Sequence, residues 1–85
     1  MGSSTWGHRH VVFQELVRQM RKEAGLTQSD LAGLLGKPQS YVSKYESGER
    51  RLDIIEVEIV CRTCGLSLQE FAGKLDAALS NRGLE

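Results

Sequence analysis

Residues 39–44 place polar side chains on one side of a short segment whose other side carries Val42 and Tyr45. The polar residues are Gln39, Ser40, Ser43 and Lys44. A glutamine can hydrogen-bond bidentately to adenine, a lysine can donate to guanine, and a serine can bond to either with less selectivity. If the segment is helical, these four side chains form one exposed face. The pattern therefore favours recognition through hydrogen bonds.

Two cysteines form a second group with possible chemistry, because Cys61 and Cys64 make a C-x-x-C spacing. This spacing is compatible with a zinc site, a redox pair or simple packing. Zinc requires four ligands, yet no second cysteine pair or H-x₃₋₅-H motif follows, and His8 and His10 are distant in sequence. In a helix both thiols share the predicted core face, where cysteine behaves as a small hydrophobe. We interpret the pair as packing residues and keep a thiol switch as the alternative.

Catalysis is the least favoured class of function. The chain contains no paired carboxylates, nucleophile–base set or phosphate-binding glycine loop at a meaningful spacing. We therefore predict no catalytic residue, no metal site and no cofactor. The segment His8-Arg9-His10 could hold a metal or touch DNA as a basic arm, but a terminus that does neither is the simpler interpretation.

The elements that must position the polar face lie between Leu26 and Asp53. Thr27 is a suitable N-cap, and Asp30 stands three residues later, where a capping-box partner belongs. Gly36 ends this helix, since glycine adopts the left-handed conformation without strain. Pro38 then begins a second helix that ends before Gly48. Two short helices joined by a tight corner predict a helix-turn-helix.

Apolar periodicity predicts three flanking helices over residues 9–24, 53–64 and from 67 onward. Asp53 caps the first of the later two, and Ser67 with Glu70 forms a capping box for the last. The inward residues of the 53–64 helix are expected to be Ile54, Val57, Val60, Cys61 and Cys64. We predict an all-α five-helix bundle over residues 9–80, with a flexible tail at 1–8 and a frayed end at 81–85.

The 26–53 stretch resembles the helix-turn-helix of the Cro/repressor (phage-repressor-like, XRE) family, and the likeness extends from about Phe13 to Phe71. The matching residues are Leu26, Thr27, Gln28, Leu31, Ala32, Leu35, Gly36, Gln39, Ser40, Val42, Ser43, Lys44, Tyr45, Glu46, Ser47, Gly48, Glu49, Arg50 and Leu52. The resemblance implies a lambda-repressor-like fold that binds DNA with the second helix of the motif in the major groove.

The resemblance also implies roles for individual residues. Gln39, Ser40 and Lys44 match base-reading positions, with Ser43 also within reach. The expected phosphate contacts are Thr27, Gln28, Lys37, Tyr41, Arg50 and Arg51. In small relatives the last helix often forms the dimer contact, which points to Leu68, Phe71, Leu75, Ala78 and Leu79. Glu46 is interpreted as a structural residue that bonds backbone or an arginine.

The formal net charge of zero is unusual for a DNA-binding protein, but the charge is unevenly distributed. Residues 37–51 carry four basic and two acidic side chains, a balance of +2, whereas residues 52–85 carry three basic and six acidic ones, a balance of −3. Phosphates respond to the local field, within roughly 8 Å at physiological salt. We therefore expect modest non-specific affinity and a larger role for base contacts.

These observations predict a sequence-specific transcriptional regulator, a repressor or operon controller, that binds a palindromic site on double-stranded DNA as a homodimer. The alternatives are a protein-interaction module that keeps the fold without the DNA role, and an antitoxin-like protein that also binds a protein partner. No stretch approaches the roughly 18 apolar residues of a membrane span, and no signal peptide is evident. We therefore expect a cytoplasmic protein without membrane association.

Overall fold

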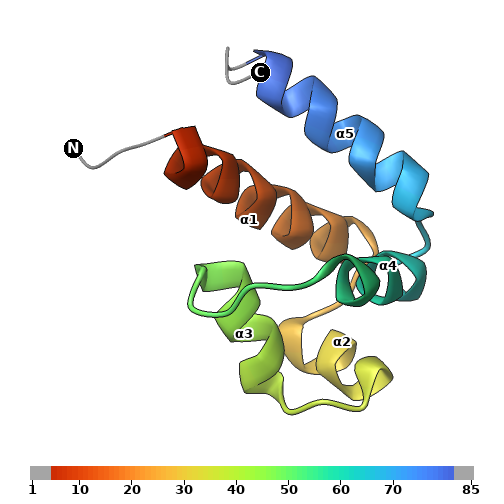
Figure 1. The fold of residues 1–85 in the computed structure, drawn as a ribbon. Helices are drawn as coiled ribbons and strands as arrows, with labels where there is room; N and C mark the ends of the chain where they lie inside the picture. The colour runs from red at the N-terminus through yellow and green to blue at the C-terminus, as the bar shows by residue number, and fades with distance from the viewer. Residues whose placement is uncertain (1–4, 82–85) are drawn as a thin grey trace.

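Residues 5–81 of the computed structural model are described here, and they contain five α-helices and no strand (Figure 1). The helices are α1 (Thr5–Glu23), α2 (Gln28–Leu35), α3 (Gln39–Ser47), α4 (Ile54–Thr63) and α5 (Leu68–Asn81). The long α1 runs through the middle of the molecule, with α2 and α3 on one side and α5 on the other (Figure 1). The predicted all-α class and the predicted helix-turn-helix are confirmed.

Three helices begin with reciprocal capping boxes. At α2 the Asp30 amide donates to the Thr27 hydroxyl, and the Thr27 amide donates to the Asp30 carboxylate, both at 3.0 Å. The same exchange links Asp53 with Glu56 at α4 and Ser67 with Glu70 at α5. Each box satisfies two amide groups that a helix terminus otherwise leaves without a partner. The starts of α2, α4 and α5 are therefore determined locally by residues three positions apart.

Two glycines allow the chain to turn at either end of the motif. Gly36 has φ 69° and donates to the carbonyls of Ala32 and Gly33, which ends α2. Gly48 has φ 90° and ends α3. A side chain at Gly48 would also collide with Gln14 of α1, since a Cβ there would lie 2.3 Å from the Gln14 amide nitrogen. The second turn therefore requires glycine for its conformation, and a Cβ there would also displace the end of the Gln14 side chain.

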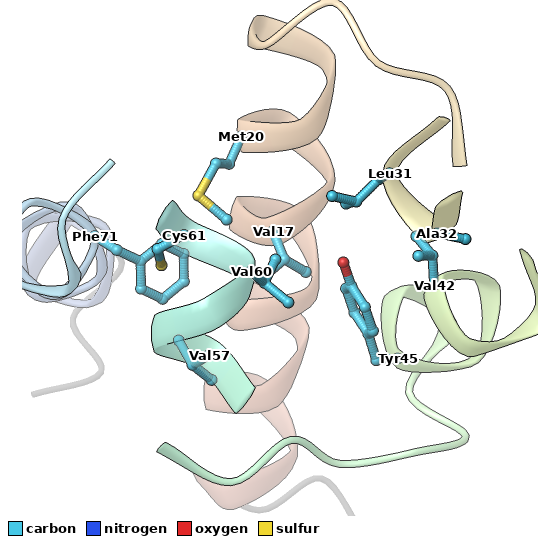
Figure 2. Close-up of a cluster of buried hydrophobic side chains, with 10 residues drawn as sticks. All are labelled: Val17, Met20, Leu31, Ala32, Val42, Tyr45, Val57, Val60, Cys61 and Phe71. Atoms are coloured by element: carbon cyan, nitrogen blue, oxygen red, sulfur yellow. The ribbon is translucent and has the colours of Figure 1, made fainter. Parts of the chain in front are cut away.

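Every helix contributes to one apolar core, with α1 at its centre (Figure 2). The buried members are Val17, Met20, Leu31, Ala32, Val42, Tyr45, Val57, Val60, Cys61 and Phe71. Phe71 of α5 packs edge-to-face on Phe13 of α1, with ring centroids 5.9 Å apart. Val42 and Tyr45 anchor α3, because their side chains are 0% and 1% exposed. This anchoring fixes which side of α3 faces solvent.

The two cysteines pack against the core, as the packing interpretation predicts. Both are free thiols, with Cys61 completely buried and Cys64 half-buried against the same core. Burial raises the pKa of Cys61 to about 11 and also raises the pKa of Cys64. Thiols with raised pKa values are poor nucleophiles near neutral pH. Their main contribution is therefore apolar contact.

Three expectations differ from the structure. The helix predicted to begin at residue 9 begins at Thr5, since residues 5–8 contain no proline to stop it and no capping residue stands just before residue 9. The helix α5 extends through Asn81, the first residue of the predicted frayed end 81–85. The other residues of the predicted tail and frayed end, 1–4 and 82–85, lie outside the described residues. Ile54 was expected to point inward but is 63% exposed, since it opens α4 while Val57, Val60 and Cys61 form the buried stripe. None of the described helices is long and apolar enough to cross a membrane.

Candidate DNA interface

The side chains predicted to read bases lie on the outer face of α3. Gln39, Ser40 and Lys44 are exposed, and Ser43 is half-buried. Val42 and Tyr45 fill the opposite side and enter the core. The corner before α3 is closed by the Lys37 amide, which donates to the Ala32 carbonyl at 2.9 Å. The sequence-predicted face is therefore present and held by a rigid turn.

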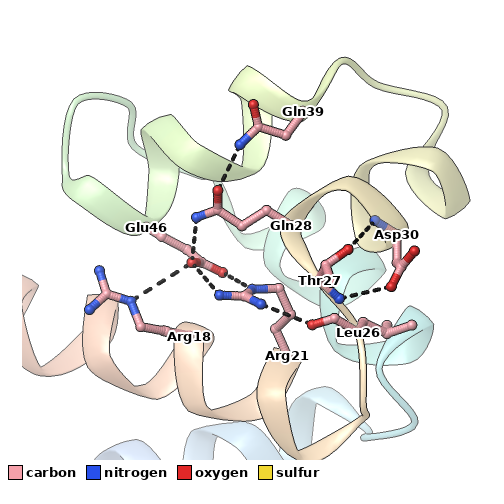
Figure 3. A network of polar contacts seen from close by, with 8 residues as sticks. All are labelled: Arg18, Arg21, Leu26, Thr27, Gln28, Asp30, Gln39 and Glu46. Carbon is pink, nitrogen blue, oxygen red and sulfur yellow. Dashed lines mark hydrogen bonds and ion pairs between the residues drawn. The ribbon is translucent and has the colours of Figure 1, made fainter.

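A chain of hydrogen bonds connects this face with the interior (Figure 3). The Gln39 side-chain NH₂ donates to the Gln28 carbonyl oxygen at 2.7 Å, and the Gln28 NH₂ donates to the Glu46 carboxylate at 3.0 Å. Gln28 comes from the start of α2, so the two helices of the motif are joined at the outer surface. The orientation of the Gln39 amide is thereby restricted.

The inner end of the chain is a buried ion pair. Glu46 is 1% exposed, and Arg21 of α1 donates to it twice, at 2.8 and 3.1 Å. Arg21 also donates to the Leu26 carbonyl at 2.9 Å, while the more exposed Arg18 lies 3.8 Å from the same carboxylate. The hydrogen bond to Glu46 raises the pKa of the Arg21 guanidinium. The prediction that Glu46 is structural and pairs with an arginine is confirmed.

A second cluster surrounds the Tyr41 ring and contains three of the predicted phosphate contacts. The Lys37 ammonium lies 5.3 Å and the Arg50 guanidinium 5.0 Å from the ring centroid. The Tyr41 hydroxyl donates to Glu56 of α4 at 3.1 Å, and Arg50 pairs with the same carboxylate oxygen. The structure thus brings together Lys37, Tyr41 and Arg50, and joins them to Glu56 of α4.

Glu56 is the residue of this cluster that sequence reasoning missed. Its pKa is lowered, first by the hydrogen bond from the Asp53 amide and then by Tyr41 and Arg50. The available signal was its position three residues after Asp53, the spacing that marked Asp30 and Glu70. That spacing predicts the cap but contains no information about a tyrosine and an arginine from other elements.

The other predicted contacts are more dispersed. The Thr27 hydroxyl accepts the capping bond from Asp30, and Thr27 itself is exposed at the start of α2. Arg51 is exposed and, like its neighbour Arg50, lines a groove beside α1 and α5. Within the described residues, no group of three or more histidine, cysteine or acidic side chains is arranged to hold a metal ion.

The predicted dimer residues divide into buried and accessible ones. Phe71 is 2% exposed and belongs to the core, so its assignment to a dimer surface is wrong. The apolar periodicity of a helix does not separate residues that face the core from residues that face a partner. Leu68 is partly buried against that core. Leu75, Ala78 and Leu79 remain half-buried on α5. Leu75 and Leu79 line an open groove of about 380 Å³ between α1 and α5, together with Phe13, Leu52, Arg9 and Arg51.

Comparisons with known proteins agree with this geometry. A family model described as "Helix-turn-helix" matches residues 17–71, which is more than half of the chain. A solved structure of an XRE-family like protein from Pseudomonas syringae pv. tomato str. DC3000 superposes with a TM-score of 0.77 at 44% sequence identity, covering 82% of this chain and 85% of that one. No curated protein matches the chain. The chain belongs to the XRE-type helix-turn-helix family of DNA-binding transcription regulators.

Proposed function

We propose that this protein recognises a specific palindromic DNA site as a homodimer and acts there as a repressor or operon controller, in the cytoplasm with the DNA. The observation that supports this most strongly is the Gln39–Gln28–Glu46 chain. One Gln39 N–H bonds to Gln28, which leaves the second N–H and the carbonyl oxygen for a ligand. Adenine presents a matching acceptor and donor in the major groove.

The remaining surface divides into two proposed tasks. Ser40, Ser43 and Lys44 follow Gln39 along the outer face of α3 and would contact neighbouring base edges. The phosphate contacts would surround that face, from Thr27 and Gln28 at the start of α2 and from Lys37, Tyr41, Arg50 and Arg51 around α3. A helix N-terminus, here that of α2, favours a phosphate through its free amides and its dipole. Base contacts would supply specificity, and the phosphate contacts would set the register.

The groove between α1 and α5 supports a dimer in which a second copy covers Leu75, Ala78 and Leu79 but leaves Arg50 and Arg51, which line the same groove, free to contact phosphates. Phe13, Leu52 and the two leucines give the groove an apolar lining. Covering such a surface is favourable at roughly 25 cal/mol per Å² of apolar area removed from water. A two-fold dimer of this kind would read half-sites about 34 Å apart, or a multiple of that distance.

A partner-binding role is a second candidate, supported by apolar side chains on α2 and α4. Leu34, Ile55 and Ile59 are 64%, 64% and 49% exposed, and the two helices pack against each other. Exposed apolar surface of this kind often marks a protein–protein contact. An antitoxin-like protein would use it together with the DNA surface, whereas a pure interaction module would use it alone.

Paired substitutions separate these functions. The Gln39→Ala/Lys44→Ala variant should lose preference for the selected site, because each good base contact contributes about 1–3 kcal/mol of discrimination. The matched control is Gln69→Ala/Lys74→Ala, which removes the same side-chain types from exposed positions on α5. Fluorescence anisotropy with specific and random duplexes measures both. Equal site preference in the two variants would contradict the proposed base-reading face.

A further inference from the structure

Glu56 joins three elements around the proposed phosphate-binding surface. One carboxylate oxygen accepts from the Asp53 amide at 2.9 Å and completes the cap of α4. The other accepts from the Tyr41 hydroxyl of α3 and from Arg50 in the loop between α3 and α4. A capping carboxylate needs only the first of these bonds. The second oxygen therefore makes contacts that the cap does not require.

The more informative of these contacts is the one with Arg50. Its guanidinium lies 5.0 Å from the Tyr41 ring centroid and pairs with Glu56, so it is held between an aromatic ring and a carboxylate. The Arg50 side chain is nevertheless 42% exposed. Arginine has five N–H donors, and the pair with Glu56 uses one of its two terminal nitrogens. Donors remain for a phosphate while the side chain is already ordered.

We propose that Glu56 is a positioning residue for DNA binding: it holds Arg50 against Tyr41 so that the guanidinium meets a backbone phosphate in a preformed orientation. The inference rests on the proposed DNA-binding surface. Ordering a long, flexible side chain before binding reduces the entropy lost in the complex. The pair also neutralises the carboxylate, which would otherwise repel phosphates.

A count of charges alone and the positioning of Arg50 predict opposite effects of losing Glu56 on DNA affinity, so the proposal can be tested. Replacing Glu56 with a neutral residue removes a negative charge near the DNA and should strengthen binding if attraction alone matters. If positioning dominates, the same replacement should weaken binding. The direction of the change therefore distinguishes the two accounts.

Glu56→Gln is the appropriate variant, because glutamine is also accepted at the third position of a capping box. Its carbonyl oxygen can keep the bond from Asp53, but its NH₂ group cannot accept from Arg50 or Tyr41. Glu70→Gln is the matched control, since Glu70 has the same capping position with Ser67 at α5. Circular dichroism and urea unfolding would verify that both variants remain folded.

Binding to the selected duplex would be measured over a range of salt concentrations for the wild type, Glu56→Gln, Arg50→Ala and the double variant. We expect Glu56→Gln to bind about threefold to fivefold more weakly, the range of a partly exposed ion pair. Arg50→Ala should bind more weakly and reduce the salt slope by about 0.9, the value for one phosphate contact. Glu56→Gln should cause no further loss in the Arg50→Ala background, and Glu70→Gln should match the wild type.

Unchanged or tighter binding by Glu56→Gln, while the wild type binds its site, would overturn this inference alone. An equal loss from Glu56→Gln with and without Arg50 would also overturn it, because the effect would then not pass through Arg50. A wild-type protein that shows no sequence preference would overturn the proposed function and, with it, this inference.

Discussion

Arg21 and Glu46 lie 25 residues apart in sequence and meet through two hydrogen bonds in the interior, where they join α1 to the end of α3. The same Glu46 carboxylate accepts from Gln28, which in turn accepts from Gln39 at the surface. A buried ion pair that joins two helices is therefore also connected to the proposed base-reading glutamine. Changes to this pair should affect stability and specificity together.

Glu46→Gln should lower the free energy of unfolding by about 3 kcal/mol, because breaking one side of a buried ion pair leaves the other charge without compensation. Urea unfolding measures this loss. The control is Glu58→Gln, whose pair with Arg62 lies at the surface, with Arg62 69% exposed, and should contribute only about 0.3–0.5 kcal/mol. Similar losses in the two variants would show that burial does not set the strength of the Arg21–Glu46 pair.

The capping boxes predict a loss of stability in acid. The pKa values of Asp30, Glu56 and Glu70 are all lowered, in each case first by a hydrogen bond from a backbone amide. Since the folded state favours the charged form, the stabilisation is complete above the unfolded pKa of about 4 and disappears as the pH falls through the lower folded pKa. The urea midpoint should therefore be steady from neutral pH to about pH 5 and then fall.

An Asp30→Asn/Glu70→Gln variant tests the source of this pH dependence. Both new side chains can still accept a hydrogen bond, but neither titrates. The fall in the urea midpoint below about pH 4 should be shallower than in the wild type. The same acid dependence in both proteins would exclude these two carboxylates as its cause.

The buried thiol of Cys61 should react slowly. Its pKa is raised to about 11 and it is 0% exposed, so iodoacetamide near pH 8 should modify it far more slowly in the folded protein than in urea. Cys64 is half-buried and should react faster than Cys61. Mass spectrometry over time measures each site. Equal labelling of Cys61 with and without urea would favour the alternative of a thiol switch.

Leu79→Glu should prevent the proposed dimer while preserving the fold. Leu79 lines the groove between α1 and α5 and is half-buried, so a charge there would oppose its burial by a second copy. Phe71→Ala is the contrasting variant, because removing a core phenylalanine should reduce stability by about 3–5 kcal/mol. Light scattering and urea unfolding distinguish the outcomes. A Leu79→Glu protein that remains dimeric would place the contact elsewhere.

Features determined by nearby residues were predictable from the sequence. Thr27 with Asp30 and Ser67 with Glu70 are capping boxes three residues apart, and Gly36 and Gly48 end helices through their own conformations. The outward face of α3 followed from the opposite placement of Val42 and Tyr45.

Features that depend on contacts between distant segments were not predictable. Gln39 and Gln28 are 11 residues apart, and Arg50 meets Tyr41 and Glu56 only after α3 and α4 pack. Phe71 and Leu75 both follow the apolar stripe of α5, yet only the partner helices determine that Phe71 enters the core. The periodicity of the sequence identifies such an apolar stripe, but it does not show which of its residues enter the core and which remain accessible to a partner.

Selection from a random pool of double-stranded DNA, at about physiological salt of 0.15 M, tests the central claim most directly. The account predicts enrichment of a palindrome whose half-sites lie about 34 Å apart, or a multiple of that distance, bound by two chains. Affinity for the enriched site should fall steeply as salt rises. Recovery of no sequence preferred over random competitor DNA would contradict the account.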